Sequence, residues 1–167
     1  FRSQDQGTTW RSVNTGLSNY FILNLLVDPN DANVIYAGTM GGLFRSTDAG
    51  STWASMRGAG IADVERYSFS WPVSAVAVKQ GDSNSVWVGT GNSHTPLAQA
   101  NWSSSSKFGH IFATTDGGVS WNEITIPGLT GGSTVFSIVL IPAGQPGPDE
   151  IIVSAQSGVF RSVDGGT

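Results

Sequence analysis

Cysteine is absent from the 167 residues, and charged side chains make up only 12% of them. The absence of cysteine excludes disulfides and thiolate metal sites. Lys and Arg together number eight, form no run, and leave a net charge of −4, so we expect no nucleic-acid partner. No apolar stretch approaches the roughly 20 residues that a helix needs to cross a bilayer, so we expect no membrane span.

Glycine, serine, threonine and asparagine take the place of the missing charge. The chain has 22 glycines, and 39% of its residues are hydrophobic, which is enough for a folded core. Such a composition suits short strands joined by many tight turns and suits helices poorly. The same low charge favours an extracellular or cell-surface location, with a periplasmic one as the alternative.

A short motif occurs four times, with Ser or Thr, Asp and Gly at fixed spacing in every copy and Trp in the first three. The Asp and Ser or Thr side chains bond back to a tight turn, and Gly takes the left-handed backbone conformation. Trp begins the next strand and covers the turn with its apolar face. The motif therefore predicts a turn between two strands, with its carboxylates committed to structure. The copies are Ser3, Asp5, Gly7 and Trp10; Ser46, Asp48, Gly50 and Trp53; Thr114, Asp116, Gly118 and Trp121; and Ser162, Asp164 and Gly166.

Short β-branched segments precede each motif and predict three strands ahead of it, with a fourth strand after it. The predicted fold is all-β: about three β-propeller blades, each a four-stranded antiparallel sheet, forming a partial propeller. The spacing of the motifs places about twenty extra residues in the second blade. The predicted units are the end of a preceding blade (1–13), blade one (20–56), blade two (72–125, with an insertion at 91–109) and blade three (134–162, lacking its last strand).

The repeats resemble the BNR or Asp-box family of β-propellers. That family includes sialidases, xyloglucanase-type glycoside hydrolases, sortilin-like receptors and photosystem II assembly-factor propellers. Residues 27–38, Val-Asp-Pro-Asn-Asp-Ala-Asn-Val-Ile-Tyr-Ala-Gly, followed by residues 42–48, Gly-Leu-Phe-Arg-Ser-Thr-Asp, most resemble xyloglucanase-type and related bacterial secreted propellers. The resemblance implies the fold far more specifically than the activity, because one fold hosts many functions.

The chain departs from the enzymes of this family in two ways. A sialidase needs three arginines that bind a carboxylate, whereas Arg2, Arg45 and Arg161 are repeat features expected on the strand surface. Xyloglucanase-type enzymes resemble two seven-bladed propellers with catalytic Asp residues facing a cleft, which three blades cannot form.

Three blades also cannot close a ring, which takes about 4–8 blades. We expect further blades from a longer chain or from copies joined head to tail, and favour the longer chain. In the head-to-tail alternative, residues 1–8 align with residues 160–167.

Two long loops, 57–72 and 91–109, flank the second blade on the face where propellers usually bind ligands. Their exposed aromatic rings beside polar groups favour a sugar-binding site, and the alternative is that the loops bury their own aromatics. Asp63 and Glu65 are candidates for an acid–base pair across a glycosidic bond. His94 and His110 lack a third ligand at a sensible spacing, so we expect no metal and no cofactor. The predicted ligand-binding residues are Arg66, Tyr67, Trp71, Asn92, His94, Trp102 and Lys107.

Three functions remain open on the sequence. The first is a non-catalytic propeller segment of a secreted or cell-surface protein, a scaffold that binds protein or glycan. The second is a fragment of a xyloglucanase-like glycoside hydrolase acting on β-glucans. The third is an assembly-factor propeller that binds a protein partner. For this chain alone we favour a non-enzyme.

Overall fold

The computed structural model describes residues 1–57, 72–91, 109–129, 132–143 and 148–166. Within these ranges every regular element is a strand, and the strands form three separate antiparallel sheets. None of the described residues belongs to a helix that is long and apolar enough to cross a membrane. The prediction of an all-β fold built from propeller-type sheets is confirmed.

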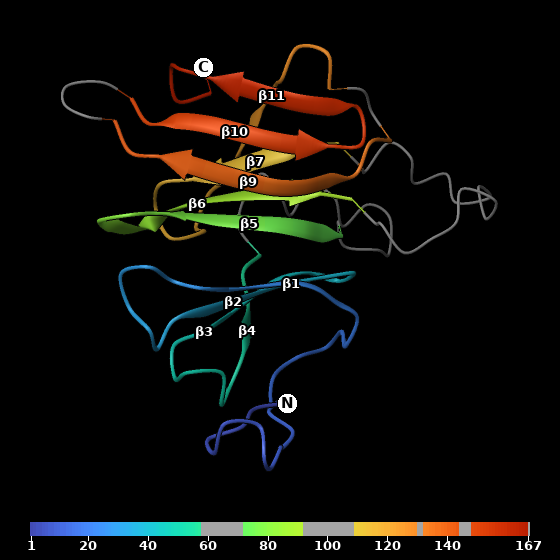
Figure 1. Ribbon diagram of the computed structural model, residues 1–167, viewed down its shortest axis with the longest axis vertical. Helices are drawn as coiled ribbons and strands as arrows, with labels where there is room; N and C mark the ends of the chain where they lie inside the picture. The colour runs from blue at the N-terminus through green and yellow to red at the C-terminus, as the bar shows by residue number, and fades with distance from the viewer. Residues whose placement is uncertain (58–71, 92–108, 130–131, 144–147, 167) are drawn as a thin grey trace.

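Each sheet is a meander in which consecutive strands are neighbours, and the sheets stack on one another (Figure 1). The third sheet has three strands and the other two have four. The first sheet holds β1 (Ile22–Val27), β2 (Ile35–Thr39), β3 (Gly42–Ser46) and β4 (Ala54–Ser55); the second holds β5 (Val73–Lys79), β6 (Asp82–Thr90), β7 (Ile111–Thr114) and β8 (Asn122–Ile124); and the third holds β9 (Val135–Ile141), β10 (Glu150–Ala155) and β11 (Gly158–Ser162).

Strand registers identify equivalent positions in the three sheets. The second strand of each sheet pairs with the third in the same register relative to the recurring motif. This equivalence allows one sheet to serve as the internal reference for another. Two sets of equivalent residues are used below: Gly38, Gly89 and Ser154 on the second strands, and Leu43, Ile111 and Val159 opposite them on the third strands.

Two apolar clusters hold the stack together. One joins the first and second sheets and contains Tyr36, Leu43, Val88 and Trp121. The other joins the second and third sheets, with Trp87, Ile111, Val135 and Val153 among its members. Alternation along each strand sends apolar residues to both faces, as expected for a sheet covered on both sides.

Glycine permits the closest approach between the sheets. A β-carbon at Gly38 would lie 2.5 Å from the backbone oxygen of Val73, and one at Gly89 would lie 2.4 Å from a methyl carbon of Val135. Both contacts are far inside van der Waals distance. The equivalent residue of the third sheet, Ser154, has a side chain.

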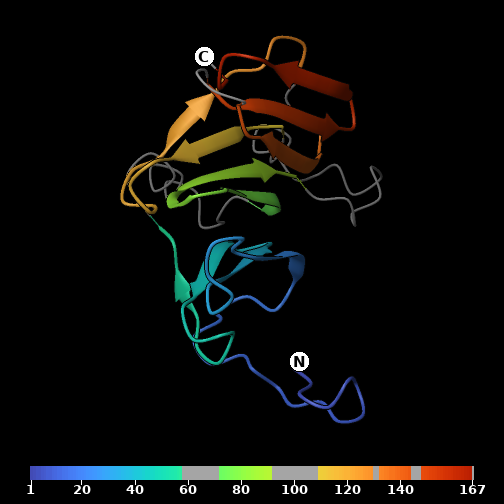
Figure 2. The same ribbon diagram turned by 60° about the vertical axis from the view of Figure 1, so that its left-hand side comes forward.

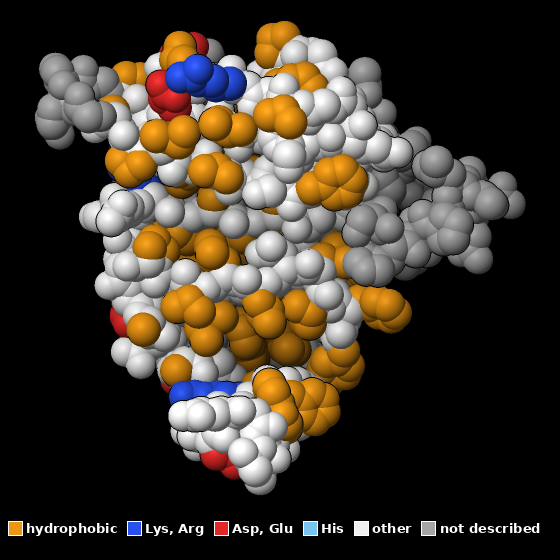
Figure 3. All heavy atoms as spheres, viewed as in Figure 1, with side chains coloured by type: hydrophobic (Ala, Val, Ile, Leu, Met, Phe, Trp, Pro, Cys, Tyr) orange, Lys and Arg blue, Asp and Glu red, His pale blue; other side chains and the backbone are white. Residues whose placement is uncertain are grey.

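The two end sheets expose apolar positions that are covered inside the stack. Val159 is 74% exposed, whereas the equivalent Leu43 and Ile111 are 4% and 1% exposed. At the other end, Leu25 and Val27 of β1 are also exposed. Figure 3 shows hydrophobic side chains gathered over the first sheet and again over the third.

The N-terminal residues form a hairpin outside the three sheets. A single bridge joins Arg2 to Arg11, and Trp10 is 62% exposed. In Figure 2 this hairpin projects away from the first sheet. Two hydrogen bonds join this segment to the turn of the first sheet: Arg2 donates to the Ala49 carbonyl at 2.8 Å, and Trp53 Nε1 donates to the Val13 carbonyl at 2.9 Å.

The surface position expected for the repeat arginines is found at Arg161, whereas Arg2 and Arg45 are half-buried. Arg161 is exposed and pairs with Glu150 at 2.8 Å. Arg45 is half-buried, with its guanidinium 5.9 Å from the ring centroid of Tyr36. Tyr36 lies in the cluster between the first two sheets, so the neighbouring sheet covers this arginine. The sequence predicted an exposed Arg45 because the strand pattern alone does not show that the second sheet packs beside it.

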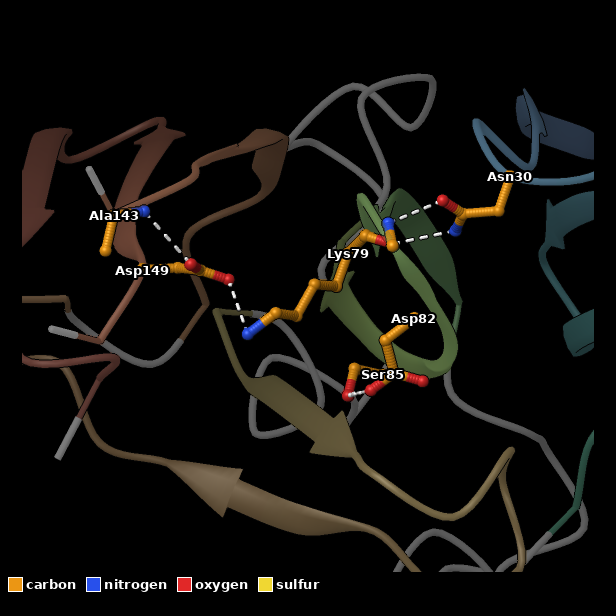
Figure 4. Close-up of polar contacts among 7 residues, drawn as sticks. Asn30, Lys79, Asp82, Ser85, Ala143 and Asp149 are labelled. Atoms are coloured by element: carbon orange, nitrogen blue, oxygen red, sulfur yellow. Dashed lines mark hydrogen bonds and ion pairs between the residues drawn. The ribbon is translucent and has the colours of Figure 1, made fainter. Parts of the chain in front are cut away.

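Polar contacts join the sheets along one rim of the stack (Figure 4). Asn30 Nδ2 donates to the Lys79 carbonyl at 2.8 Å, and Asn30 Oδ1 accepts from the Gly81 amide at 2.6 Å. Lys79 Nζ in turn lies 2.9 Å from an oxygen of Asp149. These contacts connect the turn after the first strand of each sheet to the corresponding turn of the next.

Candidate functional site

The four motifs fold into what we call the aspartate turns: residues 3–9, 46–52, 114–120 and 162–166. In the second, the Ser46 hydroxyl donates to Asp48 at 2.8 Å and accepts from the Gly50 amide at 2.8 Å. Thr52 donates to Asp48 twice, through its amide at 2.8 Å and its hydroxyl at 2.6 Å. Asp5 and Asp116 accept the corresponding bonds in their own turns.

These hydrogen bonds stabilise the ionised carboxylates. The hydroxyl and amide of Thr52, followed by the Ser46 hydroxyl, lower the pKa of Asp48 from 3.8 to about 2. Thr9 and Ser3 lower the pKa of Asp5 to about 2 in the same way. Ser120 and Thr114 hold the pKa of Asp116 well below its usual range. A group with such a low pKa stays charged at neutral pH and is a poor general acid.

We expect folding to lose stability in acid as these carboxylates are protonated. Because their pKa is lower in the folded than in the unfolded chain, their contribution is present above about pH 4 and is lost as the pH falls through about 2. Replacing Thr52 by valine removes the strongest hydrogen bond to Asp48 and should raise the pKa of that carboxyl. Carbon-detected NMR titration of Asp48 measures it.

Ser51→Ala is the matched control for this titration. The Ser51 hydroxyl donates to the Asp48 backbone carbonyl. The Ser51 backbone amide, which helps to lower the pKa of Asp48, is retained in alanine. An Asp48 pKa near 3.8 in the unmodified chain, or an equal rise in both variants, would contradict the assignment.

The last residue of the loop 57–72 and both ends of the loop 91–109 meet at one corner of the second sheet. The Gly91 amide donates to the Pro72 carbonyl at 3.1 Å, and the Gly109 amide donates to the Thr90 carbonyl at 3.2 Å. Thr90 also donates its own amide to the carbonyl of His110 at 2.9 Å. Pro72, the last residue of the first loop, therefore lies beside both ends of the second loop, at the end of the sheet opposite the aspartate turns.

A polar pair lies beside this corner. His110 Nδ1 is 2.6 Å from Glu123 Oε1, and the His110 ring stacks on Phe112 with centroids 6.2 Å apart. On the other side the third sheet approaches closely: a β-carbon at Gly91 would lie 2.6 Å from Thr134. The corner is thus built from residues of the second sheet and of the segment leading into the third.

The residues predicted to bind or act on a ligand lie in the loops themselves, outside the described residues. Their mutual positions stay a prediction. Within the described ranges, no three His, Cys, Asp or Glu side chains are grouped as a metal site would require. The residues concerned are Asp63, Glu65, Arg66, Tyr67, Trp71, Asn92, His94, Trp102 and Lys107.

Sequence reasoning missed a groove of about 300 Å³ at the edge of the third sheet. Ile124 and Ile126 line it from the second sheet and the segment after it. Ile151, Phe160 and Gly166 line it from the third. Aligning the repeats places Ile124 at the position of Met56, which packs in the cluster between the first two sheets. The repeat alignment could have pointed to this region, but an alignment does not show which neighbouring side chains pack against Ile124.

The stacked antiparallel sheets are those of β-propeller blades. No family model matches the chain. The chain is similar to xyloglucanase Xgh74A of Acetivibrio thermocellus, with 30% identity over 139 residues. This match covers 74% of the chain but 16% of that relative, so the chain spans about one sixth of the enzyme's length.

Solved propellers show the same fold. An ancestral GH74 enzyme covers 91% of the chain with a TM-score of 0.64 at 21% identity, over 18% of its own length. The GH74 xyloglucanase from Xanthomonas campestris covers 95% with a TM-score of 0.57 at 20% identity, over 21% of its length. YCF48 bound to D1 peptide covers 91% with a TM-score of 0.50 at 20% identity, over 44% of its length. The resemblance to xyloglucanase-type propellers is confirmed, and YCF48 propellers share the fold.

Proposed function

We propose that this chain is a non-catalytic propeller segment of a secreted or cell-surface protein, and that it binds a β-glucan chain through the loops 57–72 and 91–109. The supporting observation is the hydrogen-bonded corner of Pro72, Gly91 and Gly109, which holds one end of the first loop beside both ends of the second. A site of this kind holds its ligand best when its support is rigid.

The choice of a glycan follows from the loop residues and from the relatives. Trp71 and Trp102 carry the flat apolar rings that stack on pyranose faces, and Asn92 supplies an amide for sugar hydroxyls. Xyloglucanase Xgh74A, at 30% identity, makes xyloglucan the first ligand to test.

Binding of xyloglucan to the full chain tests the proposal, with titration calorimetry as the measurement. We expect binding to weaken about tenfold or more in Trp102→Ala, because an aromatic ring supplies much of the contact area in a sugar site. Trp10→Ala is the control, since Trp10 is exposed but lies on the N-terminal hairpin. Absence of binding, or equal losses in both variants, would overturn the proposal.

Catalysis is a separate question with its own assay. Incubating the intact parent protein with xyloglucan and measuring reducing ends distinguishes an enzyme from a binding scaffold. If ends are released and Asp63→Asn abolishes the release, a glycoside hydrolase replaces the non-catalytic assignment.

A peptide ligand is the second candidate. YCF48, which shares the fold with a TM-score of 0.50, was solved bound to the D1 peptide. A propeller of this kind is therefore compatible with a peptide ligand, which would favour the assembly-factor alternative if xyloglucan failed to bind.

A further inference from the structure

Among the described residues, the histidine–glutamate pair beside the corner occurs in the second sheet alone. In the register of the repeat, His110 corresponds to Gly42 of the first sheet and to Gly158 of the third. Glu123 corresponds to Ser55 of the first sheet. Glycine has no side chain that could take part in such a pair, so the repeated strands form without it. The fold therefore does not account for the pair.

The His110 side chain is held in place from two directions. Its amide donates to the Thr90 hydroxyl at 3.0 Å, and its carbonyl accepts from the Thr90 amide at 2.9 Å. Its ring stacks on the buried Phe112, with an angle of 20° between the ring planes. Backbone and ring are thus both fixed, and Nδ1 lies 2.6 Å from Glu123 Oε1.

Glu123 carries a carboxylate that is anchored at one oxygen and accessible from solvent. Its side chain is 51% exposed, whereas that of His110 is 25% exposed. A carboxylate oxygen only accepts hydrogen bonds, so His110 Nδ1 is the donor. Within the described part of the chain, His110 is the hydrogen-bond partner of this carboxylate, which leaves Glu123 Oε2 able to accept from a ligand.

Sugar hydroxyls suit an anchored carboxylate at this place. The pair lies at the end of the second sheet that carries the corner of Pro72 and Gly91. A hydroxyl that donates to a charged acceptor makes a stronger hydrogen bond than one that donates to a neutral group. A neutral glycan also suits the net charge of −4 better than an anionic one does.

We infer that Glu123 contacts the β-glucan directly, by accepting a hydrogen bond from a sugar hydroxyl, and that His110 is the positioning residue that holds its carboxylate. This inference rests on the proposed glycan function. It extends the binding site from the two loops onto the strands of the second sheet, where both side chains are fixed by the contacts described above.

Glu123→Gln tests the contact, with calorimetric titration of xyloglucan into the full chain as the measurement. We expect binding to weaken about tenfold, since the amide keeps the shape of the side chain but loses the charge of the acceptor. Glu150→Gln is the matched control. Glu150 also bonds to a basic side chain, that of Arg161, but it lies at the end of the third sheet that carries the aspartate turn. Its substitution should leave binding unchanged.

Two substitutions at His110 separate positioning from packing. His110→Phe keeps a ring to stack on Phe112 and removes the donor to Glu123, so we expect binding to weaken about fivefold or more. His110→Asn loses the ring but restores a side-chain donor, so binding should return to within about twofold of the unmodified chain. In the Glu123→Gln background, His110→Phe should have little further effect, because the two groups act as a unit.

Failure of this inference is distinct from failure of the glycan proposal. If xyloglucan binds and Trp102→Ala weakens binding, but Glu123→Gln binds within about twofold of the unmodified chain, the glycan proposal stands and the role of Glu123 is wrong. Equal losses in Glu123→Gln and Glu150→Gln, or a full effect of His110→Phe in the Glu123→Gln background, would also contradict the inference. If the unmodified chain does not bind xyloglucan, both fail. Dispersed amide spectra check the folded state of each variant.

Discussion

Replacing Gly38 by alanine is expected to lower the free energy of unfolding by about 3 kcal/mol, because the added carbon overlaps a neighbouring sheet. That carbon would lie 2.5 Å from the backbone oxygen of Val73 and 3.0 Å from one of its methyl carbons. Backbone cannot rotate away as a long side chain can, so the first two sheets must separate. Denaturant unfolding followed by circular dichroism measures the loss.

Ser154→Ala is the control for this substitution. Ser154 holds the same register position on the third sheet, which has no further sheet over it among the described residues. We expect a change of less than about 0.5 kcal/mol there. If Gly38→Ala is equally mild, the spacing between the first two sheets is wider than the structure has it.

The strands and turns could be predicted because their determinants are local. Residues 151–153 are all β-branched, which favours a strand. The Asp48 turn contains its own hydrogen-bond donors, Ser46 and Thr52. The repeat strengthens the prediction, because each copy of the motif independently indicates the same turn between two strands. The all-β fold therefore follows from the sequence alone.

Contacts between sheets could not be predicted from local sequence patterns. The surface position expected for Arg45 was wrong because Tyr36 and the second sheet cover it, and no local pattern records that neighbour. The groove beside Gly166 was missed for the same reason. Loop residues such as Tyr67 and Trp102 were nominated by composition, and composition does not fix where a long loop places its side chains.

Trp121→Ala is expected to cost about 4 kcal/mol of unfolding free energy, because it removes the largest side chain of the cluster between the first two sheets. Trp121 is only 4% exposed, and Met56 of the first sheet packs against the same cluster. Its indole nitrogen has no hydrogen-bond partner among the described residues, so the contribution is apolar. Trp121→Phe should therefore retain more than half of the stability that alanine loses.

Trp10→Ala provides the comparison within the same motif. Trp10 lies over Gly7 as Trp121 lies over Gly118, but it is 62% exposed and, among the described residues, belongs to neither apolar cluster between sheets. We expect a loss of under about 1 kcal/mol. Chemical denaturation of the three variants separates two roles for the tryptophan: closing its own turn and joining adjacent sheets. Equal losses at Trp10 and Trp121 would assign the tryptophan to the turn alone.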